Sequence, residues 1–304
     1  RARGARGARP PSAPEAGRSR PIVRGRWSTS IADTFRSLGV RNFRLFFIGQ
    51  GISQVGTWLA MVAQTLLVLH LTHNDGVSVG VLTACQFLPV LLFGAWAGVV
   101  ADRFDKRTLL VVTNAASMGQ SFVLAGLAFM ESPPLPAIFG VAAVLGFINA
   151  FDNPARRALV VEMVPQDDVA NAVSLNSALM TSSRVFGPTL AGVLSVTVGY
   201  GWCFTVNGVS YLAAIAALLM MRPSEFRSSP LVERARGQVR EGFRYIHRNP
   251  ELFVPLVMMA IIGTFTYNFT VTIPLFVING LGGSQTTFTL LFSTLSLGSL
   301  LGAL

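Results

Sequence analysis

One face of a long apolar segment near the N-terminus carries side chains that can form hydrogen bonds. Its members lie at positions i, i+4, i+7, i+11 and i+14, and they are Gln50, Gln54, Thr57, Met61 and Gln64. Such positions share one face of an α-helix, and polar groups in an apolar helix are costly unless they face a cavity or a partner. The stripe predicts either the wall of a substrate cavity or a hydrogen-bonded seam between helices. Further candidates for the cavity, in later apolar segments, are Asn207, Tyr211, Tyr267 and Asn268.

Two charged residues, Asp152 and Arg184, fall within apolar segments and are candidates for coupling. Arg184 shares a helical face with Ser177 and Thr181, so we expect it to point inward. There it would bind an anionic group of a substrate, pair with a carboxylate during coupling, or form a structural salt bridge. Asp152 lies four residues before Arg156, which fits a local ion pair, and it is also the candidate to carry a proton.

The sequence contains no motif for metal binding, ATP hydrolysis or enzymatic catalysis. The three His residues lack the Cys, Asp or Glu neighbours of a metal site, and Cys85 and Cys203 have neither metal-ligand nor disulfide spacing. The phosphate-binding pattern Gly-x-x-x-x-Gly-Lys-Ser/Thr is absent, which argues against ATP hydrolysis. A membrane-embedded enzyme would need clustered His, Cys, Asp or Glu at membrane depth. We therefore expect no metal, no cofactor and no enzymatic activity.

The composition places these residues in a membrane protein. Of the 304 residues, 51% are hydrophobic and only 12% are charged, whereas soluble domains average about 25% charged residues. Eight apolar segments approach the roughly 20 residues that a membrane-spanning helix needs. They cover 43–71, 77–100, 108–130, 135–153, 170–197, 201–221, 252–278 and 285–304. We read the chain as cut at both ends, because it begins with Arg1 and stops inside the eighth segment.

The positions of the basic residues predict how the chain crosses the membrane. Every Lys and Arg except Arg184 lies at or before the start of the first segment, or in the connections after the second, fourth and sixth segments. Cytoplasmic loops are enriched in Lys and Arg, so the N-terminus and the 222–250 connection are expected in the cytoplasm. This placement also argues against a nucleic-acid partner, although the net charge is +10. We expect a multi-pass protein of the cell membrane, with the lipid bilayer as its partner.

The long basic connection divides the chain into four parts. They are a disordered basic tail over 1–33, a six-helix transmembrane bundle over 34–221, a cytoplasmic loop with an amphipathic helix over 222–250, and the incomplete start of a second bundle over 251–304. The apolar stripe of the amphipathic helix consists of Leu231, Ala235, Val239, Phe243 and Ile246. It fits a helix on the inner leaflet of the membrane or a linker helix packed on protein.

A loop motif occupies the short connection between the second and third segments. It reads Gly-Val-Val-Ala-Asp-Arg-Phe-Asp-Lys-Arg, and its key members are Gly98, Asp102, Arg103, Lys106 and Arg107. Gly98 permits close approach of another helix, and Asp102 can accept hydrogen bonds from a helix N-terminus or a facing Arg. The motif resembles the signature of the major facilitator superfamily, except for Asp105, where the family most often has Gly. The resemblance implies a gate that latches the two halves of a transporter; an ordinary basic turn is the alternative.

A second motif, in the fifth segment, contains Arg184, Gly187, Pro188, Ala191 and Gly192. Pro removes a backbone donor and kinks a helix, whereas Gly lets helices approach closely. The motif resembles the antiporter signature of the same superfamily, with Ser174 and Ser183 where Gly recurs upstream and Ala191 in place of a Gly. It favours export over uptake; a kinked helix without a role in transport is the alternative.

Three other stretches, 42–50, 151–156 and 241–250, resemble the enterobactin-exporter and macrolide-efflux branch of the superfamily. The resemblance implies an all-α major facilitator fold, with a complete first half of six helices and the first two helices of the second half. It implies a monomeric secondary active exporter that moves a small amphipathic molecule, siderophore-like or drug-like, by alternating access. Proton coupling rests on the resemblance alone, because the Arg usual in helix four of drug–proton antiporters is absent here. The alternatives are an uptake carrier and a sensor or scaffold that does not transport; the chain alone is not expected to transport.

Overall fold

The computed structural model describes residues 34–227, 238–266, 272–273 and 276–283, and residues 287, 290, 291, 294 and 298 singly. The chain divides into two units, Arg1–Thr34 and Phe35–Leu304, and every element named here belongs to the second unit. The predicted tail over 1–33, most of the predicted eighth segment, and the cavity candidates Tyr267 and Asn268 lie outside the described residues. So do Leu231 and Ala235 of the predicted amphipathic stripe.

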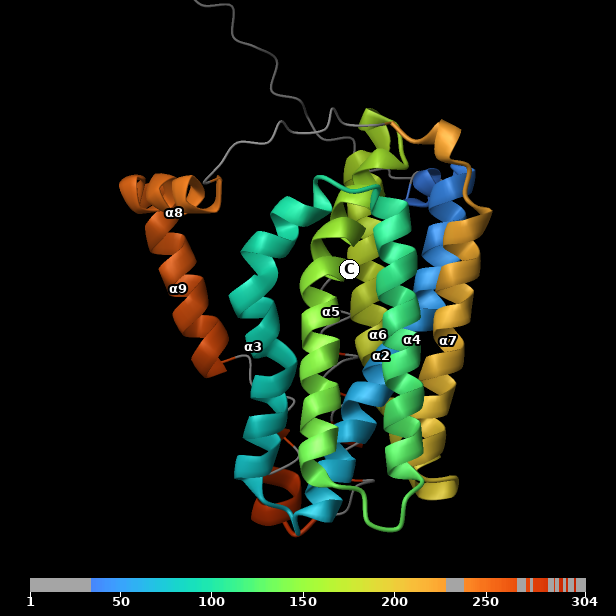
Figure 1. Cartoon of the computed structure of the whole chain (residues 1–304), viewed down its shortest axis with the longest axis vertical. Helices are drawn as coiled ribbons and strands as arrows, with labels where there is room; N and C mark the ends of the chain where they lie inside the picture. The colour runs from blue at the N-terminus through green and yellow to red at the C-terminus, as the bar shows by residue number, and fades with distance from the viewer. Residues whose placement is uncertain are drawn as a thin grey trace, which may run out of the picture. The chain divides into compact units, whose positions relative to one another are not determined.

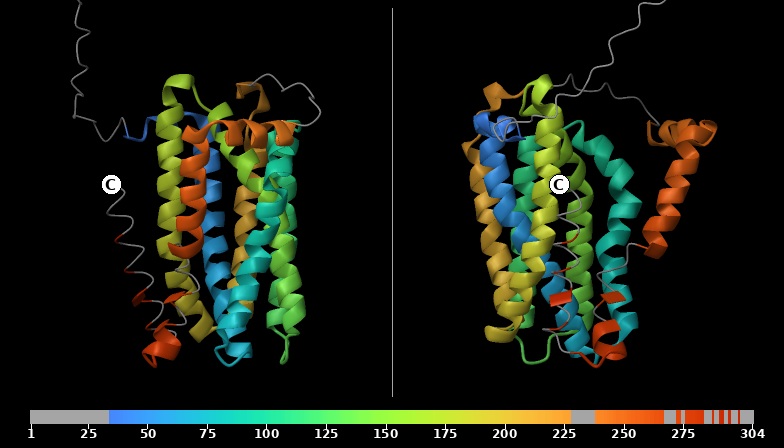
Figure 2. Two further views of the ribbon diagram at one scale, coloured as in Figure 1. Left: turned by 90° about the vertical axis from the view of Figure 1, so that its left-hand side faces the viewer. Right: turned by 180° about the vertical axis from the view of Figure 1, so that it is seen from behind.

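All regular secondary structure in the described residues is helical, without a strand, which confirms the predicted all-α fold (Figure 1). The elements are η1 (Arg36–Gly39), α2 (Arg41–Leu71), α3 (Gly76–Ala101), α4 (Lys106–Ala128), α5 (Leu135–Glu162), η2 (Gln166–Asp168), α6 (Val169–Thr197), α7 (Tyr200–Met220), η3 (Pro223–Glu225), α8 (Gln238–Arg248), α9 (Pro250–Thr266) and the π-helix η4 (Phe276–Gly280). The first six predicted segments correspond to α2–α7, which run side by side as an antiparallel bundle (Figure 2).

The predicted end of the fourth segment is wrong. We expected it to stop at 153, before Pro154, with Arg156 in a loop, whereas α5 continues to Glu162. A proline inside a helix removes one backbone hydrogen bond and disfavours the preceding turn. Packing outweighs that cost here, because Ala155 and Leu159 beyond the proline are fully buried in a hydrophobic cluster.

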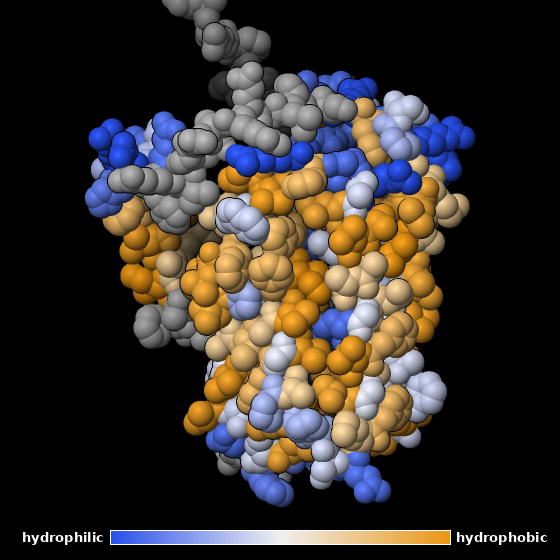
Figure 3. All heavy atoms as spheres, in the orientation of Figure 1, coloured by the Kyte–Doolittle hydropathy of each residue, from blue (hydrophilic) through white to orange (hydrophobic). Residues whose placement is uncertain are grey.

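Five of the described helices, α2, α3, α4, α5 and α7, are long and apolar enough to cross a membrane. The helix α6 has the length of a span but carries Asn, Ser and Thr along much of its course and is not among the five. Figure 3 shows apolar side chains over the flank of the bundle and hydrophilic ones gathered toward its ends. Such a distribution is expected of a protein whose flank faces lipid.

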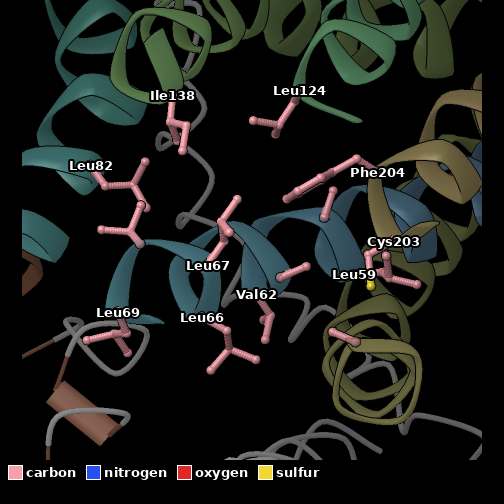
Figure 4. Packing of buried hydrophobic residues seen from close by; sticks show 14 of the residues in the cluster. Leu59, Val62, Leu66, Leu67, Leu69, Leu82, Leu124, Ile138, Cys203 and Phe204 are labelled. Carbon is pink, nitrogen blue, oxygen red and sulfur yellow. The ribbon is translucent and has the colours of Figure 1, made fainter. Parts of the chain in front are cut away.

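The helix α2 lies at the core of the bundle. It packs on α6 and α7, while α4 packs on α5 and α7, and α3 packs on α5. The second half of α2 carries much of one hydrophobic cluster, which contains Leu59, Leu66 and Leu67 together with Phe204 of α7 and Ile138 of α5 (Figure 4). In contrast, the most apolar stretch of α3 is only 11% buried, against 72% for α2. One face of α3 is therefore available to lipid or to protein beyond the described residues.

Aspartates begin the helices α3 and α4. The Asp75 carboxylate accepts hydrogen bonds from the Val77 N–H at 3.2 Å and the Ser78 N–H at 2.9 Å. The Ser78 hydroxyl and these N–H groups hold the pKa of Asp75 below its usual range, because they stabilise the charged form. Asp105 accepts in the same way from the Thr108 N–H at 2.8 Å. Side-chain acceptors at this position satisfy donors that a helix start leaves unpaired.

Candidate functional site

A cavity of about 290 Å³ lies inside the bundle and receives side chains from all six helices α2–α7. Its polar lining residues are Gln54, Thr57, Gln64, Gln86, Asn114, Ser117, Gln120, Ser121, Asn149, Asp152, Asn153, Arg156, Arg184, Asn207 and Tyr211. Its apolar lining includes Trp58, Met61, Phe87, Leu124, Leu145 and Met180. Small-molecule sites are concave, with a few well-placed polar groups in a partly apolar wall. This cavity has that character, and eight of the fifteen polar lining residues just named are Asn or Gln.

The predicted stripe on α2 forms one wall of the cavity, with one exception. Gln54, Thr57, Met61 and Gln64 line the cavity, whereas Gln50 does not. Gln50 is 2% exposed, and its amide oxygen and nitrogen have no hydrogen-bond partner among the described residues.

The same stripe also forms hydrogen bonds between helices. The Gln86 amide of α3 donates to Gln64 Oε1 at 3.0 Å. The Thr57 and Tyr211 hydroxyls lie 3.2 Å apart, and Thr57 Oγ1 lies 2.9 Å from the Ser53 carbonyl. Because Thr57 has one hydroxyl proton, which goes to Ser53, the Tyr211 hydroxyl is the donor of the pair. The cavity wall and the interhelical seam are thus one structure.

The wall on α4 was missed in the sequence. It consists of Asn114, Ser117, Gln120 and Ser121, with Leu124 one turn further. These residues recur at helical spacing within an apolar segment, which is the signal that identified the α2 stripe. Short Ser and Asn side chains among Ala and Val conceal the signal, since they are common in helix contacts.

Asn207 joins α7 to the α4 wall. Its amide nitrogen donates to Ser121 Oγ at 2.8 Å, and the Ser121 hydroxyl donates to the Phe204 carbonyl at 3.2 Å. Since the only proton of that hydroxyl is directed at the carbonyl, Ser121 Oγ must accept from Asn207, which fixes the orientation of the amide. The Asn207 oxygen is buried without a partner in the described part of the chain and lies beside Gly56, where a Cβ would come within 2.9 Å of it.

Asp152 lies on α5 at the cavity wall and is 4% exposed. Arg156 Nε donates to Asp152 Oδ2 at 3.0 Å, and the Thr113 hydroxyl of α4 donates to Oδ1 at 2.8 Å. The local ion pair that the spacing predicted is therefore present. Both charges also line the cavity, so the pair forms part of the candidate site.

Arg184 lines the cavity from α6, and its guanidinium carbon lies 5.1 Å from the centroid of the Trp58 ring on α2. A cation over an indole face is attracted by the quadrupole of the ring. No carboxylate of the described residues pairs with Arg184. An Arg at mid-membrane without compensation costs roughly 2.5–3.5 kcal/mol or more.

The remainder of the α6 motif shapes the contact with α2. A Cβ at Gly187 would lie 2.4 Å from the Trp58 Cβ and 2.9 Å from the Leu59 N, so glycine permits the two helices to touch. Pro188, within α6, has no N–H to offer to the carbonyl one turn earlier. Ala191 is fully buried, and Gly192 follows it along the helix.

The loop motif between α3 and α4 has two kinds of member. Lys106 and Arg107 bind neighbouring helices: Lys106 Nζ lies 2.9 Å from Glu162 Oε1 at the end of α5. Arg107 donates from Nε to the Leu218 carbonyl at 2.6 Å, near the end of α7. Positive charge and N–H donors are favourable at a helix C-terminus, where carbonyls lack partners.

Gly98, Asp102 and Arg103 have no such partners in the part of the chain that the structure describes. Asp102 and Arg103 are exposed, and the Asp102 carboxylate accepts no hydrogen bond from any residue that the structure describes. A Cβ at Gly98 would meet no described residue within 4 Å. The expected partners of Gly98 and Asp102 are therefore not in the described bundle, and the helix-capping role that the sequence assigned to Asp102 belongs to Asp105.

The fold and the cavity define a class of protein: a multi-pass helical membrane protein with a polar chamber between its helices, as expected of a small-molecule transporter. A family model described as transmembrane secretion effector matches residues 32–304. The chain belongs to this family, within the efflux-like branch of the major facilitator transporters. Members of this family are transporters and not enzymes.

Several curated proteins are similar to the chain. The staphyloferrin A transporter of Staphylococcus aureus is 23% identical over 86% of this chain and 66% of its own length. Macrolide efflux protein A of Streptococcus pyogenes is 22% identical over 71% of this chain and 54% of its own length. The multi-drug resistance efflux pump PmrA homolog of Lactococcus lactis is 27% identical over 63% of this chain and 45% of its own length. The chain thus spans about half to two-thirds of the length of these relatives.

Proposed function

We propose that this protein is a secondary active exporter of a small amphipathic molecule, siderophore-like or drug-like. The observation that carries the proposal is the cavity of about 290 Å³, to which six packed helices contribute polar and apolar side chains. Polar groups at membrane depth are kept where they serve a pathway or a site. Two of the similar proteins are named for efflux of macrolides or multiple drugs, and one is named as a transporter of staphyloferrin A, which supports transport of an organic cargo with polar and apolar parts.

The arrangement of charge supports the predicted orientation, with the N-terminus in the cytoplasm. The start of α2, the α3–α4 loop, the end of α5 and the end of α7 meet at one end of the bundle. Most of the basic residues of 34–227 are found at this end. Under the positive-inside rule this end faces the cytoplasm.

Alternating access would use the loop motif at the same end. Lys106 and Arg107 already hold the loop to α5 and α7. The Asp102 carboxylate and the open side of Gly98 are available for contact with a second helical half. The full-length protein would contain such a half, as the greater length of its relatives suggests. The loop would then contact the second half when the two halves meet and close the cytoplasmic entrance to the cavity, and it would lose that contact when they part.

Proton coupling would use Asp152. It is the only carboxylate that lines the cavity formed by the described residues, and its charge is held by Arg156 and Thr113. Protonation would break the ion pair and free Arg156 inside the cavity, which links a proton to a change in the cavity wall.

Counterflow in proteoliposomes that contain the full-length protein tests the function. Vesicles preloaded with a candidate siderophore or macrolide should accumulate the labelled molecule from outside, and an imposed pH gradient should drive net transport. Vesicles without protein and vesicles with a dissipated gradient are the controls. Failure of every candidate to exchange would contradict a transport function, and net uptake by intact cells would contradict export.

A further inference from the structure

The charged lining of the cavity is small and unequal. Among the described residues that line it, three carry charge at neutral pH, namely Asp152, Arg156 and Arg184, and no Lys, Glu or His of the described chain joins them. Cavity walls of one sign concentrate ligands of the opposite sign, because a low-dielectric surround screens charge poorly.

Two of these three charges compensate each other. Asp152 and Arg156 form an ion pair whose side chains are 6% and 12% exposed, and Thr113 supplies a further hydrogen bond to the carboxylate. A pair so fixed presents little net charge to a ligand in the cavity. The remaining charge is that of Arg184.

Arg184 is positioned to meet a ligand. It reaches the cavity from α6 and lies over the Trp58 ring, yet it forms no ion pair within the described residues. Stacking on an aromatic face leaves the edge of a guanidinium and its N–H donors free. That edge matches a carboxylate in a bidentate arrangement.

The rest of the lining suits an organic group attached to the anion. Phe87, Leu124, Leu145 and Met180 give apolar surface, and Met adapts to ligands of different shape. Carboxamides such as Gln54 and Gln120 add hydrogen-bonding groups without charge. As far as the described residues form it, the cavity therefore combines one cation without an ion-pair partner, neutral polar groups and apolar surface.

We infer that the cargo class is an amphipathic organic anion, whose carboxylate is bound by Arg184 beside Trp58, and not an organic cation. This inference rests on the proposed transport function and adds to it the charge of the substrate. Asp152 does not select a cationic drug, because its charge is already satisfied within the wall.

Matched probes of one shape and different charge test the inference. Naphthoate, naphthamide and naphthylmethylammonium differ at one substituent. Their affinities for the full-length protein in nanodiscs of neutral lipid can be measured by calorimetry against empty nanodiscs. We expect naphthoate to bind about tenfold or more tightly than naphthamide, since a hydrogen bond to a charged group adds that much, and the ammonium to bind least.

Variants assign the preference to its residue. Arg184→Gln should reduce the ratio of naphthoate to naphthamide affinity to about one, and Arg184→Lys should keep part of it, because charge remains without the planar fork. Arg157→Gln removes the same charge from an exposed position that does not line the cavity and should leave the ratio unchanged. A misfolded variant would lose both ligands, so the ratio separates a folding defect from a change in charge preference.

Three results would overturn the inference. The first is that naphthoate does not bind, and the second is that naphthamide or the ammonium binds as tightly as naphthoate. The third is that Arg184→Gln leaves the ratio of naphthoate to naphthamide affinity unchanged. None of these would remove the proposed function, which depends on counterflow. Conversely, if the protein preferred naphthoate but exchanged no cargo in the counterflow assay, the anion-binding inference would stand and the proposed transport function would be wrong.

Discussion

At the scale of single residues, the ion pair of Asp152 and Arg156 has a measurable part in stability. Removal of one partner from a buried pair leaves the other charge uncompensated and costs about 3 kcal/mol or more. We expect Asp152→Asn to lower the melting temperature of the purified protein clearly. The double variant Asp152→Asn with Arg156→Gln should recover part of the loss, because it leaves no charge behind.

Arg157→Gln is the matched control for this pair. Arg157 is exposed, and substitutions of exposed residues away from special features change stability by about 0.5 kcal/mol or less. If the double variant were no more stable than Asp152→Asn, the ion pair would not be the reason for the loss.

Glycine at 187 sets the distance between α2 and α6. A methyl group added at Gly187 of α6 would lie 2.4 Å from the Trp58 Cβ and close to backbone atoms of α2, so the two helices would have to separate. We expect Gly187→Ala to destabilise the protein by about 1–3 kcal/mol, the usual cost of overpacking. Gly126→Ala, in α4, is the control, because a Cβ there meets nothing within 4 Å and alanine favours helix. Equal melting temperatures of the two variants would refute the close contact.

Some residues of the candidate site could be predicted from the sequence, and others could not. The α2 stripe was visible because several polar residues recur with helical spacing over four turns. Asn149 and Asn153 of α5 were missed, since two isolated amides form no stripe. Gln50 was included wrongly in the cavity wall, because periodicity defines a face of a helix but not how far along it a cavity extends.

At the scale of elements, the two aspartates of the loop motif have different structural roles at the start of α4. Asp105 accepts the Thr108 N–H, whereas Asp102 has no partner among the residues described. We expect Asp105→Ala to cost about 1 kcal/mol of stability, as loss of a helix cap does. Asp102→Asn should keep the melting temperature and abolish transport by the full-length protein, because we propose that its carboxylate meets the second helical half during gating.

Counterflow and thermal unfolding of the two variants, measured side by side, test this division. Unchanged transport in Asp102→Asn would remove the gating role from the loop. A stability loss in Asp102→Asn as large as that of Asp105→Ala would show that the two residues share one structural task.

Element boundaries show where local sequence signals are insufficient. Pro154 predicts the end of a helix, yet α5 continues because the residues after it are buried and Glu162 binds Lys106. The ion-pair partner lies at the start of α4, and the hydrophobic cluster also contains residues of α2, α6 and α7. All of them are distant in sequence, so no local pattern contains these contacts. The departure at Asp105 is likewise explained by a backbone contact that a motif comparison does not show.

At the scale of the whole molecule, composition and charge placement were sufficient to predict a helical membrane bundle. Apolar segments near 20 residues and a low charged fraction leave few other folds. The pairs of helices in contact could not be derived in the same way. The helix α2 packs mainly on α6 and α7, which are distant in sequence, and less on α3, which follows it directly. Small residues such as Gly49, Gly56 and Gly187 mark those contacts but do not identify the partner helix.

The export proposal and the proposed gating role of the loop both depend on the direction in which the bundle crosses the membrane. In a background without Cys85 and Cys203, single cysteines at Phe104, in the α3–α4 turn, and Glu131, in the α4–α5 turn, would be treated with a membrane-impermeant maleimide on intact cells. We expect Glu131→Cys to be labelled and Phe104→Cys to react only after the membrane is permeabilised. Equal labelling of both in intact cells, or labelling of Phe104→Cys alone, would contradict the proposed threading and the cytoplasmic position of the loop.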